Sequence, residues 1–384
     1  MRLSDSRAEA RFRADLETWL AENEPPADRL SDPPRSSGHI PGWAREWQRS
    51  LFDAGWLVPR WPAELGGREA TPVQQMIYLE ELSHRRLPRT VNPQGLEVCA
   101  PTIIDLGDDG QRDRWVSPTL HGEMTWCVAV EAVDGQEGGP SALTVTQRDR
   151  DLVVEGAITA PAGAAHADRC LCGVRAVPAG SRFGEVAVLA VDLARPGVTR
   201  PDGDGGELVL DGVVVEDDEI VGGVDQGWPA LQSIRARLRS VRWITSLLAI
   251  QRALDALADV GRGRGLADDA VFRHTLAGLQ VEADAVRALA YRALAKQETG
   301  RPNPELAMLP LVTREAEQRI YLTGVESLGT DGLDLGLEGP RTWPGGSWAS
   351  EWLGSTAEAA AAGGSAAERD RVAGRILGIP LGSA

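Results

Sequence analysis

The pattern of apolar and polar positions divides the chain into three regions, and the first is helical. Within residues 7–23, Phe12, Leu16, Trp19 and Leu20 recur at helical spacing and form one stripe. Thr71 and Pro72 have the residue types of a helix N-cap and first helical position. The pattern predicts helices over 7–23, 42–54, 72–85 and 95–106, with a short one near 111–115.

The second region, from Met124 to about Gly223, changes to short runs of alternating apolar residues. Turns containing Gly, Asp or Pro separate the runs, and no helical pattern lies between them. This arrangement predicts an antiparallel sheet, closed as a small barrel or packed as a sandwich, and argues against a two-layer α/β unit. The expected strands are TWCVAV, ALTVTQ, DLVVEGAIT, RCLCGVRAV, EVAVLAVDL and GELVLDGVVV.

The third region returns to helical periodicity after Asp225. Its expected helices cover 227–260, 268–298, 304–324 and 357–377, and these four helices predict a four-helix bundle. The predicted fold is therefore α+β, with an N-terminal α-helical domain (1–123), a central antiparallel β-barrel-like domain (124–225) and a C-terminal four-helix-bundle domain (226–384).

Composition narrows the classes of function. The 384 residues carry a formal net charge of −16, which disfavours a surface for nucleic acid or for anionic membranes. No run of apolar residues is long enough to span a membrane, and the first residues lack the apolar block of a signal peptide. We therefore expect a cytoplasmic protein.

The chain has four cysteines, and none of them has a metal-site spacing. Cys170 and Cys172 lie two apart in an expected strand, so both side chains should point to one face. No second Cys or His pair completes a zinc site, and none of the five histidines forms a helix-spaced pair. We expect buried free thiols and no metal.

Several segments, collinear along the chain, resemble acyl-CoA dehydrogenases of the actinobacterial type. The segments are GWLVPRWPAELGG, TPVQQMIYLEEL, VNPQGLEVCAPTIIDLG, HGEMTW, HADRCL, QGW, GLADDAVFRHTLAGL and RILGIPLG. The resemblance implies the family's three-part fold, FAD as cofactor, an acyl-CoA ester as substrate, and a dimer or tetramer that houses the flavin at subunit contacts. In that chemistry a desolvated carboxylate removes the α-proton of the thioester, and the flavin accepts the β-hydride.

Neither of the family's two positions for the base carries a carboxylate in this chain. The first position, a few residues before RWI, falls at Leu238, and residues 226–254 contain no Asp or Glu at all. That helix carries Arg235, Arg237, Arg239 and Arg242 instead. The second position falls at Ala362, counting back from the end of the chain; Glu358, one helical turn upstream, is a weak substitute or an exposed helix residue.

The flavin-contact segments of the first two regions are also changed. The family's Ser- and Pro-containing loop reads EAVDGQEG here, and its added carboxylates disfavour a phosphate. The family's Trp-Thr or Trp-Ser pair falls at Ala160 and Pro161, which provide no aromatic wall. His166 lies near a position where the family often has histidine, and packing or solvent contact is its expected role.

The resemblance retains part of the adenosine side of the flavin site, which in this family one subunit provides to its neighbour. The residues that it assigns to cofactor binding are Arg262, Arg264, Arg273, Glu326, Gly329 and Gly332, with Glu326 in place of the usual glutamine. An arginine cluster in solvent and an ordinary interhelical loop explain the same residues without a ligand.

Three functions therefore compete. The first is the non-catalytic partner subunit of a hetero-oligomeric acyl-CoA dehydrogenase, with FAD shared in trans and a homologous subunit as partner. The second is an active FAD-dependent dehydrogenase with a relocated base such as Glu358. The third is a flavin-free protein that binds acyl-CoA without chemistry. The substrate class expected from the resemblance is a fatty acyl or steroid side-chain thioester.

Overall fold

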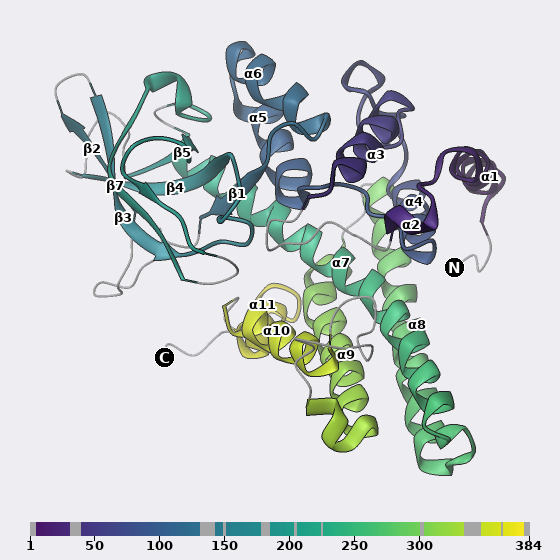
Figure 1. Ribbon diagram of the computed structural model, residues 1–384. Coiled ribbons are helices and arrows are strands. Elements are labelled where there is room, and N and C mark those ends of the chain that lie inside the picture. Colours follow the sequence, from purple (N-terminus) through teal and green to yellow (C-terminus); the bar gives the residue numbers. More distant parts are fainter. Residues whose placement is uncertain are drawn as a thin grey trace. The chain divides into compact units, whose positions relative to one another are not determined.

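The computed structural model describes residues 5–30, 40–130, 143–148, 151–177, 185–202, 206–223, 226–299, 303–333, 347–361 and 364–379 (Figure 1). The chain forms two compact units. One unit comprises 1–19, 70–86 and 239–384, and the other comprises 20–69 and 87–238. Helices α1 (Arg7–Asn23) and α7 (Gly227–Gly263) each contribute to both units.

Short helices open the second unit. They are α2 (Ala27–Leu30), α3 (Gly42–Asp53), the 3-10 turn η1 (Ala63–Leu65), α5 (Ala100–Leu106) and α6 (Asp109–Leu120). The helix expected over 95–106 begins as a π-helical turn, η2 (Gly95–Cys99). Gly95 is required there, because a Cβ atom would lie 2.1 Å from Oδ1 of the buried Asn92. Asp108 caps α6 through a hydrogen bond from the Gln111 N–H.

The expected runs of alternating apolar residues form a sheet in the second unit. Its strands are β1 (Trp126–Ala129), β2 (Thr144–Arg148), β3 (Asp151–Thr159), β4 (Arg169–Val177), β5 (Val186–Asp192), β6 (Val198–Thr199) and β7 (Glu207–Val215). The strand order is β1-β4-β2-β3-β7-β6, with β5 also on β4. The 3-10 turn η4 (Asp217–Glu219) follows β7.

The sheet is mixed, which corrects the prediction of a purely antiparallel sheet. Strand β4 pairs parallel with both β1 and β2, whereas β2–β3, β3–β7, β4–β5 and β6–β7 are antiparallel. The sequence did not predict the parallel pairs because β4 pairs with strands that are distant in sequence. The alternation of apolar residues within a strand carries no information about the direction of such partners. Between Val154 and Gly156 the register with β7 shifts, and Gly156 has a φ of 137° that suits glycine.

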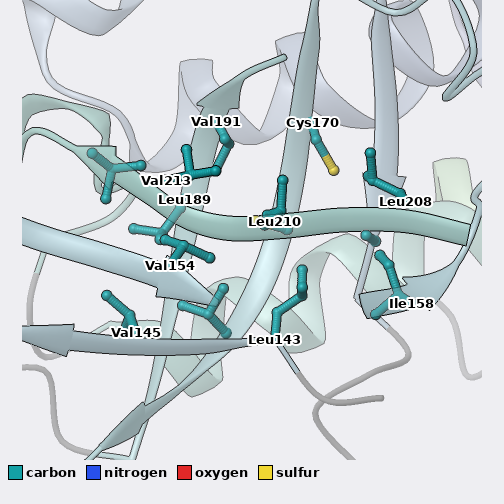
Figure 2. Close-up of a cluster of buried hydrophobic side chains, with 14 of the residues drawn as sticks. Leu143, Val145, Val154, Ile158, Cys170, Leu189, Val191, Leu208, Leu210 and Val213 are labelled. Atoms are coloured by element: carbon teal, nitrogen blue, oxygen red, sulfur yellow. The ribbon is translucent and has the colours of Figure 1, made fainter. Parts of the chain in front are cut away.

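One face of this sheet carries the core of the second unit (Figure 2). Val154, Leu189 and Leu210 are almost completely buried in it and come from three strands. Cys170 and Cys172 both lie in the same core, which confirms that their side chains share a face. The dense packing of small branched side chains excludes water from this face of the sheet.

The first unit is built from long helices. They are α4 (Pro72–His84), α8 (Ala270–Glu298), α9 (Glu305–Leu328), α10 (Trp348–Ala361) and α11 (Gly364–Arg375), together with the part of α7 from Arg239. The 3-10 turns η5 (Leu266–Asp268) and η6 (Gly329–Leu333) join them. Thr71 and Pro72 cap α4 as expected, since the Thr71 Oγ1 accepts from the Gln74 N–H.

The prediction of one helix over 357–377 is wrong. Helix α10 ends at Ala361 and α11 begins at Gly364, whose φ of +72° interrupts helical geometry. The last of the four predicted helices is therefore two shorter helices.

Helices α9 and α10 approach closely, because a Cβ on Gly324 would lie 2.1 Å from the Trp348 ring. Among the described residues, no helix is both long and apolar enough to cross a membrane.

Candidate functional site

The first base position of the resembled family is occupied by an apolar residue. Leu238 is half-buried on α7, in the part of this helix that belongs to the second unit. A leucine side chain has no atom that can accept a proton. Because residues 226–254 contain no Asp or Glu, no neighbouring turn of α7 supplies a carboxylate either.

The charged side chains on this part of α7 are arginines. An Nη2–H of Arg235 donates to the carbonyl oxygen of Val130 at 3.1 Å. Arg237 forms an ion pair with Asp105 on α5, and its Nε is buried without an acceptor among the described residues. This stretch of α7 therefore presents cations, which cannot act as a base at neutral pH.

The second base position lies outside the described residues at Ala362. Glu358 falls within the backbone of α10, but its side chain is outside what the structure describes. The role of Glu358 as a substitute base therefore stays a prediction.

Two segments expected at the flavin ring have different outcomes. The EAVDGQEG loop, 131–138, lies outside the described residues. Ala160 packs against the core of the sheet, and its N–H donates to the Gly206 carbonyl at 3.0 Å. The Pro161 carbonyl accepts from the Ala164 N–H, so this turn is closed by its own backbone. His166 lies in the same turn, where its backbone N–H donates to the Gly163 carbonyl.

The glycine turn that the resemblance assigns to the adenosine side has a backbone geometry that favours glycine. Gly329 ends α9 with φ 59° and ψ −131°, and open space surrounds the position of its Cβ. Gly332 is packed closely, because a Cβ there would lie 2.2 Å from the Val325 carbonyl oxygen. Glu326 is exposed on the last turn of α9. The chain therefore forms a tight turn whose backbone can approach a ligand.

The structure joins part of the basic segment to this glycine turn. Arg264 forms an ion pair with Asp331 in η6, although the two residues are 67 apart in sequence. Arg262 forms an ion pair with Asp259 at the end of α7. Arg273 is exposed on α8 and forms no ion pair with any described residue. Sequence reasoning identified the arginines but missed their acidic partners, although Asp331 lies within the ESLGTDG motif.

The chemical types of these residues suit the pyrophosphate and adenosine part of FAD. A rigid glycine turn and nearby guanidinium groups are a donor set for a phosphate or pyrophosphate. Arg262 and Arg264 each already form an ion pair with a carboxylate, so the positive charge of these two residues is largely balanced within the chain. Ala160 offers no aromatic surface to the flavin ring, so the fit is confined to the adenosine side.

The four cysteines are fully buried and unbonded. Hydrogen bonds with the neighbouring Cys127 and Cys172 thiols raise the pKa of Cys170, and burial raises the pKa of Cys99. The thiols of Cys99 and Cys170 are therefore kept in the unreactive protonated form. Among the described residues, no group of His, Cys, Asp or Glu side chains is arranged to hold a metal ion.

Comparison with known proteins places these features in a family. Residues 6–123 match the family model of the acyl-CoA dehydrogenase N-terminal domain, and residues 225–377 match that of the C-terminal domain. The acyl-CoA dehydrogenase IpdE1 of Mycobacterium tuberculosis is 24% identical over 383 residues, covering 96% of this chain and 97% of that protein.

Solved structures show the same fold. The Tcur3481-Tcur3483 steroid ACAD matches with a TM-score of 0.79 and 20% identity, covering 99% of this chain and 100% of that one. A chain of the ChsE4-ChsE5 complex from Mycobacterium tuberculosis matches with a TM-score of 0.78 and 19% identity over the whole of both chains. Since two family models and full-length relatives agree, the chain belongs to the acyl-CoA dehydrogenase family.

Proposed function

We propose that this chain is the non-catalytic partner subunit of a heteromeric, FAD-dependent acyl-CoA dehydrogenase. The assembly would carry out α,β-dehydrogenation of an acyl-CoA thioester. The observation that carries the proposal is Leu238, an apolar side chain at the first base position on a helix that has no Asp or Glu from 226 to 254.

The chemistry of the reaction explains why this observation supports a non-catalytic role. Removing a weakly acidic α-proton requires a desolvated carboxylate held against the reacting carbon. Leu238 cannot accept that proton, and the nearby Arg235 and Arg237 on the same helix carry guanidinium groups instead of carboxylates. In this proposal a homologous subunit supplies the base, and this chain supplies scaffold and part of the cofactor site.

The cofactor part of the proposal rests on the adenosine side. FAD, when bound, would accept the electrons that leave the acyl group. This chain would contact its pyrophosphate and adenosine with the set identified above: Arg262, Arg264, Arg273, Glu326, Gly329 and Gly332. The tight packing of Gly332 beneath Val325 supports this role, because it fixes a turn whose backbone can approach a phosphate.

The relatives support a heteromeric partner and a bulky substrate. The names Tcur3481-Tcur3483 and ChsE4-ChsE5 each denote two different chains, and one of these proteins is described as a steroid ACAD. We accordingly expect a dimer or tetramer with a homologous acyl-CoA dehydrogenase subunit, acting on a steroid side-chain or other bulky acyl-CoA ester.

One observation favours a second candidate, a flavin-free protein that binds acyl-CoA. Arg262 and Arg264 are both neutralised within the chain, which weakens their attraction for a pyrophosphate. A flavin-free protein would be stabilised by acyl-CoA while showing no flavin absorbance, with or without a partner.

The test is turnover by the chain co-expressed with a homologous subunit from its genomic neighbourhood. Glu358→Gln in this chain should leave turnover unchanged, whereas removal of the partner subunit's base should abolish it. Loss of turnover in the Glu358→Gln assembly, with flavin content unchanged, would instead favour an active chain with a relocated base.

A further inference from the structure

Asp331 is placed to compete with any anion for Arg264. The two side chains form an ion pair that connects η6 with the segment after α7, within one compact unit. They are 36% and 40% exposed, so a dissolved ligand can reach both groups. The turn that carries Asp331 is fixed, since Gly332 packs against the Val325 carbonyl and Gly329 adopts a glycine-specific conformation.

The arginine nearest in sequence to Arg264 is also paired with a carboxylate. Arg262 is occupied by Asp259, and Glu326 adds an exposed carboxylate one turn before Gly329. Asp269 is held nearby as the cap of α8, with its Oδ1 accepting from the Phe272 N–H at 2.7 Å. A phosphate that approaches this surface therefore meets Arg262 and Arg264, whose charges are already paired, and the exposed Arg273, which forms no ion pair with any described residue.

We propose that Asp331 competes with phosphate groups for Arg264, so that the diphosphate of an adenine nucleotide binds at Arg264 only by displacing the Asp331 carboxylate. The inference rests on the proposed function, because the diphosphate meant here is that of the flavin cofactor. It assigns to Asp331 the role of setting how tightly this chain holds the cofactor's phosphates.

The solvent exposure of the Arg264–Asp331 ion pair limits how strongly Asp331 can compete with a ligand. An exposed ion pair contributes at most about 1 kcal/mol, which corresponds to about fivefold in a binding constant. The pair is therefore weak enough to open when other contacts are added by a partner subunit. Its removal should raise the affinity for a nucleotide by no more than about fivefold.

The experiment measures ADP binding to the full-length chain by titration calorimetry at fixed ionic strength. Asp331→Asn should tighten binding by about threefold to fivefold, because Arg264 then has no internal carboxylate. The matched control is Asp268→Asn, which removes the same charge from an exposed residue that forms no ion pair with any described residue. Binding to this control should change by less than about 1.5-fold, because salt screens exposed charges. The double variant Arg264→Gln/Asp331→Asn should lose the gain.

Two results would overturn the inference: equal changes in Asp331→Asn and Asp268→Asn, or no tightening of ADP binding in Asp331→Asn. Asp331→Ser provides a second variant without the carboxylate, and circular dichroism verifies that each variant is folded. Failure here leaves the proposed function to its own test, because the Glu358→Gln and partner-base variants used there leave Asp331 unchanged.

Discussion

Arg287 on α8 donates two hydrogen bonds to Glu80 on α4. Its Nε lies 2.8 Å from Oε1, and its Nη2 lies 3.0 Å from Oε2. Tyr291 donates a third hydrogen bond to the same carboxylate, at 2.6 Å. On the next residue of α4, Glu81 forms an ion pair with Arg13 of α1. Consecutive carboxylates thus hold α4 between two helices of the first unit.

Loss of the Glu80 charge should destabilise the protein. Glu80→Gln leaves a half-exposed guanidinium with one acceptor instead of a bidentate carboxylate, so we expect a loss of about 2 kcal/mol in the free energy of unfolding. Urea unfolding measures this. Glu282→Gln is the matched control, because its Arg319 pair is exposed and should contribute less than about 1 kcal/mol. Equal losses in the two variants would contradict the account.

Tyr291 predicts a dependence of stability on alkaline pH. Burial and the adjacent Glu80 carboxylate raise the pKa of Tyr291 above its ordinary value of about 10. A pKa that is raised by folding gives stability that is present below pH 10 and is lost as the pH rises further. Tyr291→Phe should therefore be less stable than the natural protein at pH 8, and the difference should shrink above pH 10. A difference that stays constant up to pH 11.5 would be inconsistent with this coupling.

The buried thiols predict slow chemical labelling. Cys99, Cys127, Cys170 and Cys172 are fully buried, and the pKa values of Cys99 and Cys170 are raised. In the native protein, Ellman's reagent should react only as the second unit opens, and all four thiols should react at once in strong denaturant. Rapid labelling of one thiol in native buffer would contradict the close packing described around it.

The glycine turn predicts an order of sensitivity to a single added methyl group. Gly332→Ala should be the most damaging, because its Cβ would lie 2.2 Å from a carbonyl oxygen. Gly329→Ala should cost about 1–2 kcal/mol from its positive φ alone. Gly354→Ala in α10 is the control, since it meets no atom within 4 Å and should stabilise by about 0.5 kcal/mol. Thermal denaturation ranks the three, and a tolerated Gly332→Ala would refute the close packing.

Local features of the fold were readable from the sequence because they depend on adjacent residues. The helix over 7–23 and the Thr71 cap are examples, since each is encoded by a stripe or a motif within a few positions. The acyl-CoA dehydrogenase family followed from collinear motifs and is confirmed by the family models. The division at 123 and 225 stays a prediction.

Long-range pairing was not readable in the same way. The parallel partners of β4 and the Arg287–Glu80 pair, 207 residues apart, depend on how distant segments meet. The same holds for Arg264 and Asp331: each residue was visible as a charge, but their mutual neutralisation appears only in three dimensions. The break between α10 and α11 was missed because the Ala-rich sequence is favourable to helix on both sides of Gly364.

The most direct test of the central claim is an absorbance spectrum of the chain purified alone and after co-expression with a homologous neighbour. The visible absorbance bands of flavin should be absent from the lone chain and present in the co-purified assembly, because the chain supplies only part of the site. Stoichiometric flavin in the lone chain, together with turnover of an acyl-CoA, would contradict the assignment of Leu238 to an inactive base position.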